Sequence, residues 1–340
     1  MTTRYEEIRI KGKGIKVPTC QIMGREVVVK GQWIKTAIVQ DEDLVECGIV
    51  PAPFSFIPKL ITSGLKADIF TFAQDVDAST PKYPFRFEWD NAAVISTLDY
   101  NGWWESLSQE SRKNTRRAAK KGVLVKVVAF DDEFVKGVKL IYDESPLRQG
   151  RQFWHYGKDI DLVKSENGTY LDRSEFIGAY WNDELIGFMK WTYVNKVAKI
   201  MQILSKNSHY DKRPMNALIT KAAEVCHQKG MHYLEYSKFT YGNKAISSLA
   251  EFKRRMGFQQ INFPRYYIPL TLRGKVALML GAHRGLIGVL PPRLINLLLS
   301  IRLRLLRKSV NKKNPEIDHE RTNTQKQQAE GRATSSLTGI

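Results

Sequence analysis

The 340-residue sequence has little cysteine and no long apolar run, and each lack excludes a class of protein. Its three cysteines, Cys20, Cys47 and Cys226, form no CxxC pair and no metal-ligand spacing, so we expect neither a disulfide framework nor a bound metal. No apolar stretch approaches the roughly 18 residues that a membrane-spanning helix needs. The opening residues MTTRYEEIRIKGKG lack the apolar core of a secretory signal, so we expect a protein of the cytoplasm.

Acidic residues are missing from two stretches that are rich in basic ones. The first, SRKNTRRAAKKGVLVK (Ser111–Lys126), holds seven Lys or Arg, and the second, Thr271–Lys313, holds ten. Elsewhere acidic and basic residues nearly balance, although the formal net charge is +18. Positive charge confined to two segments predicts two local contacts with anions.

Apolar periodicity and turn residues predict alternating helices and strands from Gly122 to Leu270. The predicted strands cover 122–130, 175–181, 184–194, 197–206, 231–239 and 258–270, and the predicted helices cover 131–145, 158–166, 213–230 and 244–257. The prolines of the last strand predict an edge position or a bend. The order β-α-α-β-β-β-α-β-α-β predicts a mixed α/β fold, with a central mixed sheet flanked by helices.

Composition divides the chain into four segments. Residues 1–102 form a β-rich region, either a small domain or a partial half-domain on the main sheet, and residues 103–270 form the main domain. Residues 271–313 form a basic amphipathic segment, and residues 314–340 are a polar tail that we expect to be disordered.

Three stretches carry a resemblance to a known family. WWESLSQESRKNTRRAAKKGVLVKV, YDKRPMNALITKAAEVCHQKGMHYLEY and SLAEFKRRMGF occur in this order between Trp103 and Leu270. They resemble motifs of GNAT-fold acyltransferases of the FemABX and CelD/BcsL-like type. The resemblance implies a GNAT-like fold, a transferase activity, and acyl-CoA or aminoacyl-tRNA as co-substrate with no tightly bound cofactor.

The chain departs from these relatives where an anionic donor would bind. Ordinary GNAT enzymes hold the coenzyme A pyrophosphate in a glycine-containing loop at a helix N-terminus. The corresponding stretch here, KNSHYDKRPMNALI, has no glycine, and the glycine-containing YDFGG ending of the family is replaced by LEYSKFTYG. The sequence therefore leaves the donor open.

Four residues are candidates for catalysis. Lys253 stands where the family has the lysine of its FK element, and the resemblance implies that it stabilises negative charge on the reacting carbonyl. Tyr241 and Glu235 flank the end of the strand at 231–239 and are candidates for relaying a proton. His155, in the loop SPLRQGRQFWHYGK, is either a structural histidine or a general base.

The candidate substrate-binding residues are basic or lie at a helix start. Helical spacing puts Arg112, Arg116 and Lys120 on one face, which is either a solvated surface or an anion-binding wall. Arg148, Arg151 and Lys158 lie among aromatic residues in one loop, and Arg213 and Asn216 begin a predicted helix.

We interpret the chain as an acyl or aminoacyl transferase acting on an amine or hydroxyl of a cell-envelope glycan precursor, either a sugar nucleotide or a lipid-linked glycan. A non-catalytic nucleic-acid-binding protein that uses the two basic segments is the alternative, and tRNA is a possible partner in either case.

The segment from Arg293 to Lys308 predicts an amphipathic helix with a cationic polar face. Such a helix is typical of proteins that lie on an anionic membrane surface, here the inner face of the cytoplasmic membrane. Packing of the same helix against the protein's own domain or a partner is the alternative.

Overall fold

The computed structural model describes residues 4–285 apart from 11–12, 47, 51, 77, 79, 149–150 and 242–246, together with Ser300. The chain forms two compact units, one of Met1–Ser145 with Trp154–Val289 and one of Pro146–Phe153 with Leu290–Ile340. The predicted amphipathic helix at 293–308, Ser300 apart, and the predicted disordered tail at 314–340 lie outside the described residues.

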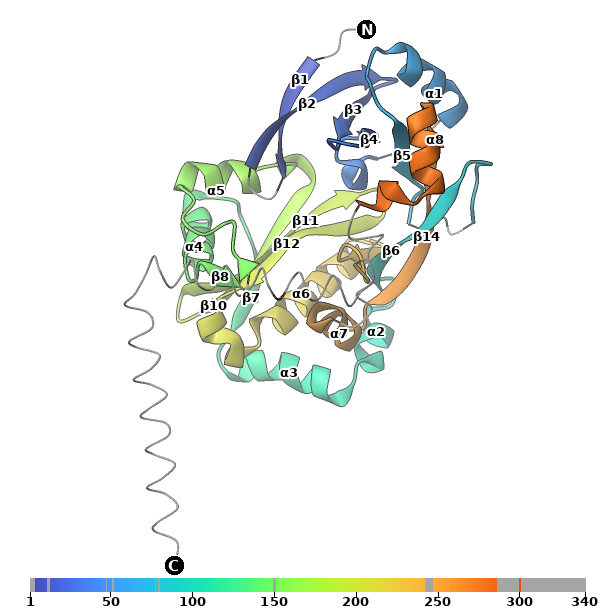
Figure 1. The fold of residues 1–340 in the computed structure, drawn as a ribbon. Helices are drawn as coiled ribbons and strands as arrows, with labels where there is room; N and C mark the ends of the chain where they lie inside the picture. Colours follow the sequence, from blue (N-terminus) through green and yellow to red (C-terminus); the bar gives the residue numbers. More distant parts are fainter. Residues whose placement is uncertain are drawn as a thin grey trace, which may run out of the picture. The chain divides into compact units, whose positions relative to one another are not determined.

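A single mixed sheet organises the first unit (Figure 1). Among the described residues its order is β1-β2-β3-β4-β5-β14-β6-β13-β12-β11-β10-β7. The strands are β1 Arg4–Ile10, β2 Lys13–Ile22, β3 Arg25–Lys30, β4 Thr36–Val39, β5 Ile69–Ala73, β6 Phe87–Ser96, β7 Leu124–Val128, β10 Ser174–Trp181, β11 Glu184–Val194, β12 Val197–Ser205, β13 Tyr233–Glu235 and β14 Gln259–Pro269. Neighbouring strands are antiparallel except for the parallel pairs β4–β5 and β12–β13. The predicted mixed α/β fold is confirmed.

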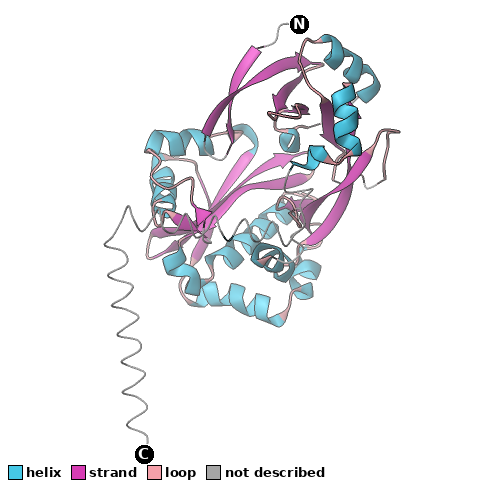
Figure 2. Cartoon of the chain, in the orientation of Figure 1, coloured by secondary structure: helices cyan, strands magenta, loops and turns pink. Residues whose placement is uncertain are grey.

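Helices flank this sheet (Figure 2). They are α1 Pro53–Thr62, α2 Tyr100–Ser106, α3 Gln109–Lys120, α4 Asp132–Tyr142, α5 Ile160–Asn167, α6 Pro214–Gln228, α7 Ser248–Arg255 and α8 Leu272–Met279, with short 3-10 turns η1 Glu42–Leu44, η2 Leu171–Arg173, η3 Asn207–Lys212 and η4 Ala282–Arg284.

Alternation along the strands assigns the helices to the two faces of the sheet. Phe188 of β11 packs edge-on against Phe134 of α4, with ring centroids 6.0 Å apart. The next residue, Met189, points to the opposite face and joins the apolar cluster that contains Leu218 of α6. The α4 side and the α6 side of the sheet are therefore distinct, and functional groups can be assigned to one or the other.

The central meander follows from its turns. Asn182 and Asp183, between β10 and β11, both have positive φ angles of 49° and 62°, and Asn195, between β11 and β12, has a φ of 52°. Asn and Asp tolerate this left-handed conformation better than other non-glycine residues, and it suits two-residue hairpins. The three strands accordingly begin and end within a residue of their predicted positions.

The N-terminal half has the same order of elements as the central part of the chain, and the two halves exchange one strand each. A meander (β2–β4), a helix (α1) and a strand parallel to β4 (β5) correspond to β10–β12, α6 and β13. The strand that follows β5 in sequence, β6, pairs with β13, whereas β14 pairs with β5. Strands from both sides of residue 102 thus share one sheet, and the boundary at 102 stays a prediction.

Strand β14 is not at an edge of the sheet, which corrects one of the two alternatives predicted from its prolines. It pairs with β6 over Gln259–Tyr266 and with β5 over Arg265–Pro269. The carbonyl of Pro264 accepts a hydrogen bond from Gln74 N at 2.9 Å on the β5 side. The N–H and C=O of a residue point to the same side of a strand, so the N–H that Pro264 lacks would also point toward the β5 side. Pairing with β5 begins only at Arg265, so no hydrogen bond between the two strands is lost at Pro264.

The second unit is described only in part. Its strands β8 (Leu147–Arg148) and β9 (Arg151–Gln152) form a small antiparallel hairpin in which Leu147 is paired with Gln152.

Gly257 ends α7 with a φ of 76°, and a Cβ atom there would lie 2.7 Å from Trp103 Nε1 and 2.8 Å from Leu107 Cδ2. Gly24 is a matched control, because its φ is also 76° but a Cβ atom there would have no other atom within 4 Å. We expect Gly24→Ala to lower the free energy of unfolding by ~1 kcal/mol through backbone strain alone, and Gly257→Ala by a further ~1–3 kcal/mol through the clash. Urea unfolding measures both, and equal losses would contradict the packing described at Gly257.

Candidate active site

Strands β12 and β13 separate soon after they meet. They pair in parallel at only three positions, from Val197↔Tyr233 to Lys199↔Glu235. Beyond Lys199, β12 continues to Ser205 beside β11, and its register there shifts from Trp191↔Ile200 to Lys190↔Gln202. Met201 is the extra residue of this bulge and is 41% exposed. The fork between β12 and β13 leaves one edge of β12 without a neighbouring strand among the described residues.

A buried ammonium group lies at the β13 side of the fork. Lys253 of α7 is 0% exposed, and its Nζ donates hydrogen bonds to the carbonyls of Tyr236 (2.5 Å) and Lys238 (2.7 Å). The same nitrogen lies 4.2 Å from the Tyr236 ring centroid and 5.5 Å from that of Tyr241. Burial lowers the pKa of Lys253 to about 8, an effect that Glu235 partly opposes. The amine is therefore still mostly charged at neutral pH.

Lys253 holds an irregular piece of backbone in place. Ser237 has a φ of 46°, which is unfavourable for a residue with a side chain. Tyr236 N donates to Ala93 O, and Ala93 N donates to Ser237 O, both at 2.8 Å, so two residues of this segment face one residue of β6. The carbonyls of Tyr236 and Lys238 accept hydrogen bonds from Lys253 Nζ, and the described residues supply no acceptor for its third N–H.

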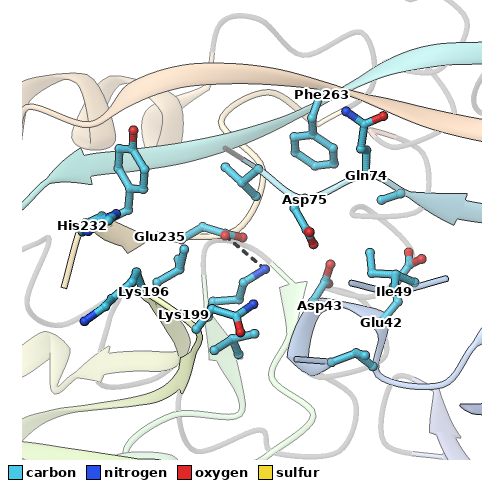
Figure 3. Close-up of a pocket in the computed structure, with 17 residues that line it drawn as sticks. Glu42, Asp43, Ile49, Gln74, Asp75, Lys196, Lys199, His232, Glu235 and Phe263 are labelled. Atoms are coloured by element: carbon cyan, nitrogen blue, oxygen red, sulfur yellow. Dashed lines mark ion pairs between the residues drawn. The ribbon is translucent and has the colours of Figure 1, made fainter. Parts of the chain in front are cut away.

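An acidic pocket of about 180 Å³ lies at the start of the fork (Figure 3). Its walls come from the η1 turn, the segment after β5, the β11–β12 hairpin and β13. The charged residues that line it are Glu42, Asp43, Asp75, Lys196, Lys199 and Glu235. Figure 3 shows Asp43 and Asp75 opposite Glu235 and Lys199. In a protein of net charge +18, this cavity has an excess of carboxylates.

Glu235 is the most buried carboxylate of the pocket, with 8% of its surface exposed. Burial raises its pKa, the Lys199 ammonium at 3.2 Å from Oε2 counteracts this, and the negative charge of Asp43 raises the pKa again. A carboxylate with a raised pKa is a better proton acceptor than an ordinary one.

A chain of ion pairs fixes the walls of the pocket. Arg265 of β14 lies between Glu42 of η1 (2.5 Å) and Asp90 of β6 (2.9 Å). Lys238 adds a second cation on Asp90 at 2.7 Å. These contacts hold the pKa of Asp90 below its usual range even though burial acts in the opposite direction. The η1 turn is thereby tied to the segment that Lys253 orders.

In the connection from β12 to α6, two backbone amides are occupied by a carboxylate and the first helical residue has no N–H. Glu144 accepts hydrogen bonds from Asn207 N (2.7 Å) and Ser208 N (2.8 Å). Pro214 takes the first position of α6 and has no N–H, and Arg213 before it has a φ of 57°. This helix start therefore lacks the glycine of a pyrophosphate cradle, whereas its first turn after Pro214 has no side-chain cap.

The structure brings three of the four predicted catalytic residues together. Tyr241 is 44% exposed, its ring faces Lys253 Nζ, and its hydroxyl lies 3.2 Å from Ser237 Oγ. Glu235 is close enough to affect the pKa of Lys253. Glu235, Tyr241 and Lys253 thus gather where β13 ends, although their assigned roles stay predictions.

His155 and Lys158 belong to a second cluster, at α4 and α5. Lys158 Nζ lies 2.5 Å from Glu166 Oε2 and 3.3 Å from His155 Nδ1. The His155 ring lies 4.5 Å from that of Tyr142, whose hydroxyl donates to Gln202 at 2.7 Å. Gln202 follows the Met201 bulge, so these contacts lead to the open edge of β12 and not to Lys253.

The three basic residues of α3 differ in their surroundings. Arg112 pairs with Glu105, and the Arg116 guanidinium lies 5.7 Å from the Trp104 ring centroid. Lys120 is exposed in the last turn of the helix. Helix α3 packs on α6, so its basic face flanks the helix that starts at the fork.

Two further predicted binding residues of the first unit, Arg213 and Asn216, do not line the pocket. Arg213 lies over Tyr210 at 5.2 Å, and Asn216 Nδ2 lies 3.1 Å from Met256 Sδ, which links α6 to the end of α7. In the second unit, the Arg148 guanidinium lies 4.8 Å from the centroid of the Phe153 ring. Arg151 of β9 is the backbone pairing partner of Arg148 of β8 in the hairpin.

Sequence analysis missed Lys199, Asp43 and Asp75, which line the pocket. Lys199 offered a signal, since it is a charge inside an otherwise apolar strand pattern. Asp43 and Asp75 lie near short or irregular segments, and their approach depends on the sheet order.

The described residues contain no cluster of three or more His, Cys, Asp or Glu side chains suited to a metal ion. In the same part of the chain, no helix is both long and apolar enough to cross a bilayer.

Comparison with known proteins identifies the fold. No protein-family model matches the chain, and the search of curated proteins gives no significant match. The crystal structure of FemX aligns with a TM-score of 0.53 at 10% identity, covering 82% of this chain and 90% of that one. The C-terminal DUF2156 domain assigned to a lysylphosphatidylglycerol synthetase of Agrobacterium fabrum aligns with a TM-score of 0.50 at 13% identity, covering 77% and 87%. The chain therefore has the GNAT-like fold of the FemABX type, as its motifs predicted.

Proposed function

We propose that the protein is an acyl or aminoacyl transferase that works at the fork between β12 and β13. The observation that carries the proposal is the joint position of the Lys253 ammonium and the Glu235 carboxylate where β13 ends. An ammonium beside a parting strand edge suits an oxyanion, and a carboxylate of raised pKa suits the release of a proton from a nucleophile.

The acidic pocket supports an amine as the acceptor. Asp43 and Asp75 are carboxylates without a cation assigned to them among the described contacts, whereas Glu235 pairs with Lys199. A protonated amine would be attracted into such a cavity, and a phosphate would be repelled. We propose that this amine belongs to a cell-envelope glycan precursor, in line with the FemABX-type fold.

The chemistry is then an aminolysis that needs only the chain's own groups and water. The bound ammonium first loses one proton to water; the neutral amine then attacks the ester carbonyl carbon of the donor, and Lys253 stabilises the oxyanion that forms. Glu235 accepts the proton that the amine loses. When the intermediate collapses, the C–O bond to the leaving alcohol breaks, and that oxygen takes up the proton that Glu235 accepted, so that an amide and a free alcohol result and Glu235 is again a carboxylate.

For the donor we propose an aminoacyl-tRNA in preference to acyl-CoA. Glu144 occupies the amides of Asn207 and Ser208, and Pro214 has no N–H, so this glycine-free connection offers a pyrophosphate fewer amide donors than a glycine-containing loop would. The basic face of α3 offers the exposed cations that a phosphate backbone needs.

Lys253→Met is expected to lower the turnover of the folded protein by about 30- to 1,000-fold, because one preorganised charge at an oxyanion contributes ~2–4 kcal/mol. The measurement is single-turnover transfer from charged tRNA to amine acceptors drawn from UDP-sugars and lipid-linked glycan precursors.

Lys190→Met is the matched control for this variant. Lys190 is 2% exposed, its Nζ also donates to two carbonyls (Asn167 and Thr169), and burial lowers its pKa to about 8 as well. Both variants leave buried carbonyls without a donor and are expected to lose a similar ~1–3 kcal/mol of stability. Equal turnover in the two variants would remove Lys253 from the mechanism.

The raised pKa of Glu235 predicts the acidic side, or limb, of the pH profile of kcat/KM. Only the deprotonated carboxylate accepts a proton, so kcat/KM is expected to rise with pH, with a midpoint above the ordinary value of 4.5 because the pKa of Glu235 is raised. Glu235→Gln is expected to remove this limb and to lower the plateau by roughly 100- to 10,000-fold. A variant that keeps the limb would assign it to another group.

The donor is tested by binding. Uncharged tRNA is expected to bind with an affinity that falls steeply with salt, and coenzyme A is expected not to bind. The triple variant Arg112→Gln, Arg116→Gln, Lys120→Gln should weaken tRNA binding and flatten its salt dependence. Lys59→Gln, Lys66→Gln, Lys136→Gln, which removes three exposed charges elsewhere, is the control.

Two results decide against parts of this proposal. Tight binding of coenzyme A with no binding of tRNA would overturn the assignment of aminoacyl-tRNA as the donor. Tight tRNA binding without transfer to any amine would favour a non-catalytic nucleic-acid-binding protein.

A further inference from the structure

Helix α8 turns apolar side chains toward solvent. Leu272 is 83% exposed, Val276 48%, Met279 63%, and Leu280, just after the helix, 72%. At 100° per residue these four positions fall within one arc of the helix surface. We call them, together with Trp33, the α8 face. Residues Gly274, Ala277 and Leu278 form the opposite, buried side.

The contacts of α8 prevent it from turning this face inward. A Cβ at Gly274 would lie 1.9 Å from Asp68 O, so only glycine permits this approach to the start of β5. Thr271 Oγ1 accepts from Gly274 N and donates to Asp68 Oδ1, both at 3.0 Å. Leu278 packs with Ile69 of β5 in a small buried cluster. These contacts fix α8, drawn in orange in Figure 1, to the sheet. Its apolar arc, by the exposure of its residues, therefore stays on the outer side.

An aromatic residue and two cations border the arc. Trp33 is 82% exposed, and its backbone carbonyl accepts a hydrogen bond from Arg273, so the backbone of Trp33 lies beside the helix start. Arg273 and Lys275 are exposed and flank the apolar arc on its two sides. Long cationic side chains at the edges of an apolar strip reach the charged headgroups, and tryptophan favours the membrane interface.

We propose that the α8 face inserts into the interface of an anionic lipid bilayer. Charge complementarity selects this occupant. A second copy of α8 would bring Arg273 and Lys275 against their own equivalents. The segment that follows, up to Lys313, contains basic residues and no acidic one, so it would also bring like charge. An anionic bilayer supplies both the apolar layer and the counter-charge. The proposal is independent of the transferase activity, because vesicle binding needs no turnover.

The test is co-sedimentation of the full chain with phosphatidylglycerol vesicles and with phosphatidylcholine vesicles. The wild type is expected to pellet with the anionic vesicles and to be partly released by salt. Leu272→Ser, Val276→Ser, Met279→Ser is expected to lower the partition coefficient at least about tenfold, because three apolar side chains no longer insert. Leu124→Ser, Leu140→Ser, Leu171→Ser is the control, since these leucines are 59%, 59% and 49% exposed elsewhere.

Two further variants test the apolar residues of the α8 face and the cations that flank it separately. Leu272→Ser alone is the fallback if the triple variant misfolds, because the side chain it removes is almost fully exposed. Arg273→Gln, Lys275→Gln should weaken the preference for anionic over neutral vesicles by about fivefold for each charge.

Three outcomes would overturn the proposal. The first is a wild type that pellets with neither vesicle. The second is an α8-face variant that binds like the wild type, which would assign membrane binding to another part of the chain. The third is a wild-type dimer that the triple variant turns into a monomer without any vesicle binding, which would make the face an interface between copies.

Discussion

The hydrogen bonds from Lys253 to the carbonyls of Tyr236 and Lys238 are the constraint on which the candidate site depends. A fully buried ammonium is costly, and here two carbonyls and two tyrosine rings replace its water shell. In return, the lysine fixes a backbone segment whose Ser237 has an unfavourable φ. This segment stays hydrogen-bonded to β6 at Ala93 while the pairing of β13 with β12 ends at Glu235, so the fork opens where Glu235 lines the pocket.

A second buried cation extends this constraint to the N-terminal half. Arg265 joins β14 to β6 through Asp90 and to the η1 turn through Glu42. The exchange of β6 and β14 makes this possible, because each strand lies between partners from the other half. Asp90 also binds Lys238, so the pocket wall and the segment ordered by Lys253 share one set of ion pairs. The pocket wall therefore depends on ion pairs between residues from both halves of the chain.

Local signals predicted the elements well, and long-range pairing explains what they missed. The hairpins at Asn182 and Asn195 and the helix ends at Gly230 and Gly257 depend on backbone conformations that neighbouring residues decide, so sequence revealed them. The central place of β14, by contrast, depends on β5, nearly 200 residues earlier. The same holds for the pocket. Lys253 and Glu235 were predicted, but Asp43 and Asp75 reach them only through the sheet order, which no local pattern carries.

The surface cations and the acidic pocket favour different chemical groups of a ligand. The exposed cations of α3 and α8 favour anionic partners at the surface, where attraction acts over about a Debye length. The pocket has the opposite sign and is smaller than any phosphate-bearing polymer, so its carboxylates exclude the groups that the surface attracts. A substrate with a phosphate at one end and an amine at the other would be oriented by this difference alone. The sign reversal between surface and cavity thus supplies a physical basis for orientation before any specific contact forms.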